Sequence, residues 1–219
     1  MSSGAGRPRA VASDYAWADD EAESGGGLFS AYCLTLVRDR SPREFMSRLG
    51  ARIVFDALRL DDQFFEISFG YWGEPHLGNV QFIGAATVPG NGGDWTLAVE
   101  VNGHLGVTPE LAVPVSAGTR LVSHYRNSGN GSNRFCWIED GDVRLEFEPL
   151  VACQRHGSAP DALLDDMRQI GFDLDEDSED PGPTTTAALA LAERLTGVRV
   201  TRAMLGEADF LCGTARLPA

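Results

Sequence analysis

The sequence predicts an α+β fold with a largely antiparallel sheet over about residues 30–150. Helices after the first strand and at the C-terminus are expected to pack on one face of this sheet. Apolar and polar residues alternate along residues 95–101 and 143–148. This period of two is typical of an antiparallel sheet with one solvent-exposed face. Most strand-like segments also precede most helix-like segments, and this order favours an α+β arrangement.

Residues 1–27 are expected to form a flexible acidic and glycine-rich tail before a single α+β domain over residues 28–219. Small polar residues dominate the tail, and an acidic run at 19–23 leads into three glycines. Tyr15 and Trp17 are exceptions to this composition. Two aromatic residues in a polar tail indicate that it docks, either on its own domain or on a partner.

The first strand and the first helix are expected to follow one another closely. Residues 32–37 are apolar and β-prone, which predicts a buried strand. Ser41 is expected to cap the next helix, with Pro42 at the first helical position and Glu44 completing a capping box. Gly50 is expected to end this helix, because glycine readily adopts the left-handed conformation that follows a last helical turn.

The rest of the chain predicts further strands and then helices. Asp140-Gly141 joins two alternating segments and is a strong signal for a two-residue hairpin. Residues 161–170 and 186–196 carry apolar residues at helical spacing, and each segment is followed by glycine. The end of the chain, 210–217, is expected to be a last strand or an apolar segment laid on the core.

The balance of charge limits the expected partners. The chain carries 18 Lys and Arg against 32 Asp and Glu, a formal net charge of −14. Such a surface repels phosphate backbones and anionic membranes and attracts a basic protein. The alternative interpretation is that the charge only keeps the protein soluble. Four widely spaced cysteines, no apolar leader and no run of about 18 apolar residues predict a cytoplasmic protein.

Standard nucleotide-binding, hydrolase and zinc-protease motifs are not found, so the sequence predicts no cofactor and no metal site. The catalytic candidates are two histidines and three carboxylates: His104, His124, Asp61, Asp62 and Glu66. His124 lies in an expected strand, where it is either a general base or an ordinary surface or core histidine. Asp61 and Asp62 are either part of an acid–base or magnesium group or a polar turn between two strands.

The candidate binding residues are acidic or aromatic. The acidic run 173–180 has three aspartates at the spacing of a calcium loop, but Ser178 replaces the glycine that such a loop requires. We therefore expect either a solvated loop or a contact for a basic partner. Its candidate residues are Asp173, Asp175, Glu176, Asp177, Glu179 and Asp180. Tyr71 and Trp72 precede a loop with glycine and proline, where rings pack in a core, anchor a partner or stack on a small molecule.

Several segments, taken together and in this order, resemble a family of uncharacterised actinobacterial proteins that is common in Streptomyces-like genomes. They are residues 32–38, 41–42, 49–51, Trp95, Glu100, 102–103, 116–119, 140–141, 147–150, 171–173, 190–198 and 211–213. The resemblance covers about residues 15–213. It implies a bacterial cytoplasmic setting and one intact domain, and it assigns no activity and no functional residue.

The leading functional hypothesis is a protein–protein interaction module, such as an adaptor, inhibitor or immunity-type protein. Its partner is another protein, and the net charge favours a basic one. One alternative is an enzyme or biosynthetic accessory protein with a non-standard site. The other is a small-molecule sensor that uses aromatic residues of the sheet. The sequence gives no information on the oligomeric state.

Overall fold

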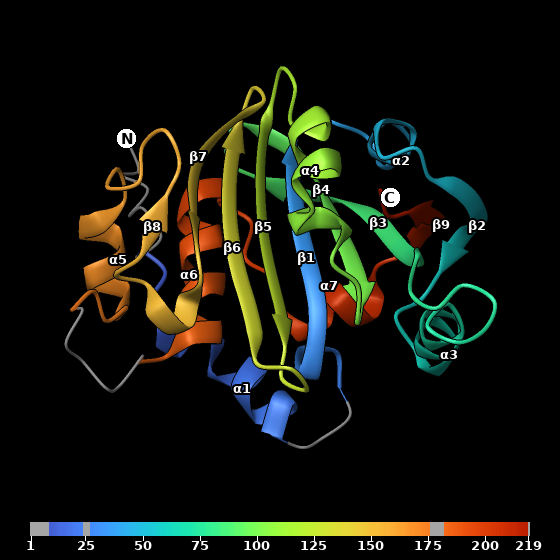
Figure 1. Cartoon of the computed structure of the whole chain (residues 1–219), viewed down its shortest axis with the longest axis horizontal. Helices are drawn as coiled ribbons and strands as arrows, with labels where there is room; N and C mark the ends of the chain where they lie inside the picture. The colour runs from blue at the N-terminus through green and yellow to red at the C-terminus, as the bar shows by residue number, and fades with distance from the viewer. Residues whose placement is uncertain (1–8, 24–26, 176–181, 219) are drawn as a thin grey trace, which may run out of the picture.

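One antiparallel sheet of nine strands organises the chain, in the order β2-β9-β3-β4-β1-β5-β6-β7-β8 (Figure 1). The structure is a computed structural model that describes residues 9–23, 27–175 and 182–218. The strands are β1 (Ala31–Arg38), β2 (Arg52–Leu58), β3 (Val80–Gly90), β4 (Gly93–Val101), β5 (Arg120–Asn127), β6 (Ser132–Glu139), β7 (Asp142–Phe147), β8 (Arg155–His156) and β9 (Phe210–Arg216). All neighbouring strands pair antiparallel, which confirms the predicted class.

Helices and short 3-10 turns connect the strands. The α-helices are α1 (Ala16–Glu23), α2 (Pro42–Arg48), α3 (Asp62–Gly70), α4 (Pro109–Val115), α5 (Leu164–Ile170), α6 (Thr184–Thr196) and α7 (Arg202–Glu207). The 3-10 turns are η1 (Ala12–Tyr15), η2 (Leu28–Ser30), η3 (Leu105–Val107) and η4 (Pro149–Val151). The two helices predicted near the C-terminus correspond to α5 and α6. Each is followed by a left-handed glycine, Gly171 and Gly197.

β1 lies in the middle of the sheet and is buried on both faces, as its continuous apolar run predicts. Leu34 and Leu36 belong to one hydrophobic core, which they share with residues of α1, α5 and α6; we call this side of the sheet the α6 face. Cys33 and Val37 belong to a second core, which they share with residues of α2, η3 and α4; we call this side the α4 face.

Helices therefore cover both faces of the sheet, rather than the single face expected from the sequence. α2 packs on the α4 face through Phe45 and Met46, whereas α6 lies on the opposite face. Figure 1 shows α4 in front of the sheet and α6 behind it. The physical reason is that a sheet with a central strand apolar on both sides has two hydrophobic faces, and both must be covered.

Local predictions at three places are confirmed. The Ser41 hydroxyl accepts a hydrogen bond from the Glu44 N–H, and the Glu44 carboxylate accepts one from the Ser41 N–H at 3.0 Å, so the capping box forms. Asp140 and Gly141 take φ values of 50° and 78° and join β6 to β7. The end of the chain forms the strand β9, which pairs with both β2 and β3.

Residues 9–23 differ from the flexible tail that the sequence predicts, because they fold against α6. Tyr15 and Ala18 are 1% and 0% exposed, and the Tyr15 hydroxyl donates to Glu193 Oε2 at 2.8 Å. The Arg194 side chain donates to the Ala10 carbonyl at 2.8 Å. Tyr15 and Ala18 are three residues apart, so they share one face of the turn of helix and bury it together.

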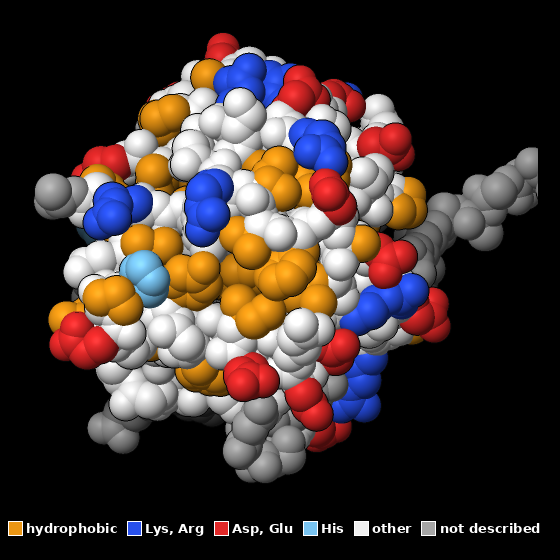
Figure 2. Space-filling view, turned by 90° about the vertical axis from the view of Figure 1, so that its right-hand side faces the viewer, with side chains coloured by type: hydrophobic (Ala, Val, Ile, Leu, Met, Phe, Trp, Pro, Cys, Tyr) orange, Lys and Arg blue, Asp and Glu red, His pale blue; other side chains and the backbone are white. Residues whose placement is uncertain are grey.

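The sheet ends on one side at β2, whose pairing with β9 is interrupted by two irregularities in register. Such bulges hinder the addition of a further strand. Ile53, Val54, Phe69 and Leu77 are exposed large hydrophobic residues of β2, α3 and the following loop. Figure 2 shows hydrophobic side chains gathered on this side of the molecule. Among the described residues, no helix has the length and apolar character needed to cross a membrane.

Candidate functional site

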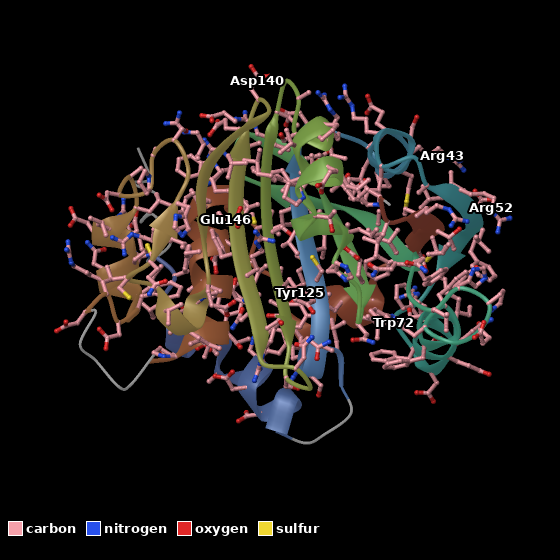
Figure 3. The ribbon with its side chains drawn as sticks, viewed as in Figure 1. Arg43, Arg52, Trp72, Tyr125, Asp140 and Glu146 are labelled. Carbon is pink, nitrogen blue, oxygen red and sulfur yellow. The ribbon has the colours of Figure 1, made fainter. Side chains whose placement is uncertain are left out.

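A groove of about 650 Å³ lies on the α4 face, over β5, β6 and β7. One wall is formed by His104, Val107, Thr108 and Pro109, at η3 and the start of α4. The other wall includes Val151 of η4, His156 of β8 and Gln154 between these two elements. The floor includes Tyr125, Arg134 and Glu146. Figure 3 shows Tyr125 and Glu146 on this part of the sheet. The groove exists because α4 is only seven residues long and leaves this part of the face uncovered.

The floor of the groove carries charge of both signs. Arg134 Nε donates to Glu146 Oε1 at 2.9 Å, and Arg134 Nη2 donates to the same oxygen. Glu148 also lines the groove, and burial raises the pKa of its carboxyl group. The Asn133 N–H donates to Glu148 Oε2 at 3.3 Å. One guanidinium therefore faces two carboxyl groups, and this part of the groove favours a cation over an anion.

His104 is held in the wall by Gln81 of β3. The His104 N–H donates to Gln81 Oε1 at 2.9 Å, and Gln81 Nε2 lies 3.0 Å from His104 Nδ1. Since the amide nitrogen of glutamine is only a donor, Nδ1 accepts and the ring carries its proton on Nε2. Burial lowers the pKa of His104, which keeps the ring neutral at a lower pH than a free histidine.

Glu100 anchors the same wall from below. Its side chain is fully buried, and its two oxygens accept hydrogen bonds from the N–H groups of Leu105 at 2.7 Å and Gly106 at 3.0 Å. Burial raises the pKa of Glu100 to about 7. A Cβ atom at Gly106 would lie 1.8 Å from Thr35 Oγ1, so only glycine lets η3 approach the sheet this closely.

An aromatic row extends the groove towards α3. The ring centroids of Trp72 and His104 are 6.4 Å apart, and those of His104 and Tyr125 are 6.0 Å apart. The Trp72 ring packs on Gly78, where a Cβ atom would come within 2.9 Å of the indole. Figure 3 shows Glu146, Tyr125 and Trp72 in sequence across this face of the molecule. The row therefore joins the charged floor to an indole at its far end.

Of the catalytic candidates, His104 alone is in the groove lining. His124 is 1% exposed and lies among hydrogen bonds within the protein. Its Nδ1 is 2.7 Å from the Tyr32 hydroxyl, and its Nε2 is 2.7 Å from Asn133 Oδ1. Burial lowers the pKa of His124 to about 4, so the ring is neutral at physiological pH.

The three candidate carboxylates belong to α3 rather than to the groove. Asp61 caps this helix, because its carboxylate accepts from the N–H groups of Gln63 at 3.1 Å and Phe64 at 3.3 Å. Asp62 and Glu66 are exposed on the helix. The polar turn expected at Asp61-Asp62 is thus the start of a helix that lies between two strands.

The structure separates the candidate binding residues. Tyr15 is buried against α6, and Trp17 is half-buried beneath the guanidinium of Arg202. Tyr71 stacks on Phe82 with 6.3 Å between ring centroids, and Trp72 lies beside the groove. Asp173 accepts from the Asp175 N–H at 2.9 Å. The other acidic candidates, Glu176, Asp177, Glu179 and Asp180, lie outside the described residues.

Sequence reasoning missed Arg134, Glu146 and Glu148, although alternation along β6 and β7 was visible. The two-residue turn pairs Glu139 with Asp142, and a regular ladder from there would place Glu146 opposite Phe135. A bulge between Trp137 and Ile138 shifts the register by one residue and places Glu146 opposite Cys136. Because directly opposed residues share a face, this shift brings Glu146 to the side of Arg134.

Comparison with known proteins identifies the family but no activity. The model of a family of unknown function (DUF6461) matches residues 8–219, so the chain belongs to this family. No curated protein matches the chain, and no solved structure matches it.

Proposed function

We propose that this member of the DUF6461 family is a protein–protein interaction module whose groove over β5, β6 and β7 binds a segment of a basic partner protein. The observation that carries the proposal is the open groove in which one guanidinium, of Arg134, meets two carboxyl groups, of Glu146 and Glu148. The resemblance noted above supports an actinobacterial and cytoplasmic setting for this role.

The charge of the whole chain supports the same choice of partner. A net charge of −14 attracts a basic protein over a distance set by salt, and the groove presents charge of the same sign at close range. Within the described part of the groove, no hydroxyl or thiol group hydrogen-bonds a histidine side chain, as a nucleophile does with its base. The geometry therefore supports binding better than nucleophilic catalysis.

Site-specific photo-crosslinking tests this proposal with the full chain in an extract of its own cells. A photo-reactive residue at Gln154, which is exposed in the groove wall, is compared with one at Asp62, which is exposed on α3. We expect a basic protein to crosslink at Gln154 and not at Asp62, and the yield to fall as salt is raised. Equal crosslinking at both positions, or none at Gln154, would contradict a groove-bound partner.

A small-molecule ligand is the second candidate, because the groove volume lies within the range of about 300–1,000 Å³ that is usual for such sites. The aromatic row supplies rings on which such a ligand could stack. A thermal-shift screen separates the two candidates, since a bound metabolite raises the melting temperature by an amount that grows with its concentration. Loss of that shift in Tyr125→Ala would assign the metabolite to the groove.

A further inference from the structure

The groove wall at residues 104–107, which we call the η3 wall, is attached to the sheet through two buried side chains, Gln81 and Glu100. The His104 N–H donates to Gln81 Oε1 at 2.9 Å. The next two N–H groups, of Leu105 and Gly106, donate to the two oxygens of Glu100 at 2.7 Å and 3.0 Å. Glu100 therefore holds the part of the wall that directly follows His104, and His104 lines the groove.

The carboxyl group of Glu100 has no positively charged partner. Its side chain is 0% exposed, and it forms no ion pair with any other described residue. Burial raises the pKa of Glu100 to about 7, although the N–H groups of Leu105 and Gly106 favour the charged form. A charged carboxylate accepts at both oxygens, whereas a neutral carboxyl group carries a proton on one of them. The two N–H groups are therefore held differently in the two charge states.

The other groups around Glu100 keep their charge state near pH 7. The titratable or charged groups that β1, β5, β6, α4 and the start of η3 place on this side of the sheet are Cys33, Tyr125, Arg134, Cys136, Glu110 and His104. Burial raises the pKa of both thiol groups and of the Tyr125 phenol, and it lowers the pKa of His104. Arg134 is already paired with Glu146, and Glu110 is exposed. Of the buried and half-buried groups in this set, Glu100 therefore stands out by changing its charge near neutrality.

We propose that the charge of Glu100 controls how firmly the η3 wall is held on the sheet, so that the groove changes with pH around neutrality. A Cβ atom at Gly103 would lie 2.5 Å from Glu100 Oε2, so the backbone next to His104 has no free space in which to absorb a change. When Glu100 is charged, both N–H groups have a strong acceptor, and His104 is held in place. When Glu100 is neutral, one of the two hydrogen bonds weakens and the wall loosens. The consequence for binding rests on the proposed function, because a loose wall must be ordered again when a partner binds in the groove.

Nuclear magnetic resonance of the full chain, without a partner, tests the effect on the wall. Amide spectra are recorded between about pH 5 and about pH 9. We expect the N–H protons of Leu105 and Gly106 to move downfield as pH rises, with a common midpoint near pH 7, because a charged acceptor strengthens their hydrogen bonds. The ring signals of His104 should show a step at the same midpoint, and the N–H of Leu36 in β1 is the control. N–H protons of Leu105 and Gly106 that do not move over this range would overturn the inference.

Protein variants identify the group that titrates. Glu100→Gln is neutral at every pH, so we expect the step to disappear from both N–H protons. Glu110→Gln removes an exposed carboxyl group from α4 and should leave the step unchanged. His104→Gln removes the titratable ring of the wall, and the midpoint should stay near pH 7. A step that persists in Glu100→Gln, or one that disappears in His104→Gln, would contradict the role of Glu100. If Glu100→Gln does not fold, the comparison of wild type with His104→Gln decides.

Photo-crosslinking at Gln154, repeated at about pH 6 and about pH 8, tests the effect on binding. In wild type the yield should be about threefold higher at the higher pH, and Glu100→Gln should lose most of this dependence. A yield that does not depend on pH, or that changes as much in Glu100→Gln as in wild type, would overturn the inference and leave the groove-bound partner in place. An absence of crosslinking at both pH values would remove the groove-bound partner, and the magnetic resonance step alone would then decide whether the wall responds to pH.

Discussion

Among single residues, Glu100 combines complete burial with an ionisable group that has two N–H donors. Burial raises the pKa of Glu100 from 4.5 to about 7 in the folded chain. Between these values the folded chain keeps a proton that the unfolded chain has lost, so the free energy of unfolding falls as pH rises. A pKa shift of this size corresponds to a loss of about 3 kcal/mol in the free energy of unfolding, and the loss is complete above pH 7.

Glu100→Gln is therefore expected to remove one pH-dependent contribution to stability. Urea unfolding of both proteins between pH 4 and 8 measures it. As pH rises from 4.5 to 8, the free energy of unfolding of the variant should rise by about 3 kcal/mol relative to that of wild type. The lost hydrogen-bond acceptor lowers the stability of the variant by a constant amount at every pH. His124, with a pKa lowered to about 4, acts in the opposite direction in both proteins and cancels in the difference. A difference that does not change with pH would contradict the assignment to Glu100.

The buried pair of Tyr32 and His124 makes a second prediction at this scale. Asn133 Oδ1 accepts from His124 Nε2, so the Tyr32 hydroxyl donates to Nδ1 at 2.7 Å. Tyr32→Phe leaves that nitrogen buried without a donor, and we expect a loss of about 1–3 kcal/mol in urea unfolding. Tyr125→Phe is the control, since it removes a hydroxyl from a half-exposed ring. Equal effects of the two variants would argue against this hydrogen bond.

At the scale of elements, the close packing of η3 on the sheet leads to a third prediction. Gly106→Ala places a methyl group against Thr35 Oγ1 and is expected to cost about 1–3 kcal/mol. Gly70→Ala has nothing within 4 Å and should leave stability nearly unchanged. Adding Thr35→Ala to Gly106→Ala should cost less than the sum of the two separate changes, because it removes the nearest contact and leaves those with Ser123 Oγ at 2.9 Å and Cys33 Sγ at 3.0 Å. Additive losses in thermal unfolding would place the strain elsewhere.

Elements that are specified by a few neighbouring residues could be predicted from the sequence, and features that depend on how distant strands pair could not. Ser41 and Glu44 specify their cap within three residues, and Asp140-Gly141 specifies its turn within two. The bulge at Trp137 and Ile138 has no such code, because it depends on how β6 meets β7. The same contrast holds for the candidate site. Trp72 and His104 are recognisable in the sequence by their residue types, whereas the pairing of Arg134 with Glu146 depends on the register between β6 and β7.

At the scale of the whole molecule, the limit of prediction was long-range packing. The apolar run in β1 indicated a buried strand but gave no information on which helix covers which side. α2 and α6 both carry apolar residues at helical spacing, and the side of the sheet that each helix covers is decided by the path of the chain between strands. The N-terminal segment shows the same limit, since Tyr15 meets Glu193 across 178 positions of sequence.

That contact makes the last prediction, which concerns the N-terminal segment as a part of the core. Tyr15→Ala removes a ring that is 1% exposed and takes one partner from Glu193, so we expect a loss of about 3 kcal/mol or more. Removing residues 1–23 should lower the melting temperature further, because Ala18 and the Ala10 contact with Arg194 are lost as well. Asp20→Ala, at an exposed position of α1, is the control and should change stability by less than about 0.5 kcal/mol. If the shortened chain melted at the wild-type temperature, residues 9–23 would be the flexible tail that the sequence predicts, and the contacts of Tyr15 and Arg194 would contribute nothing to the fold.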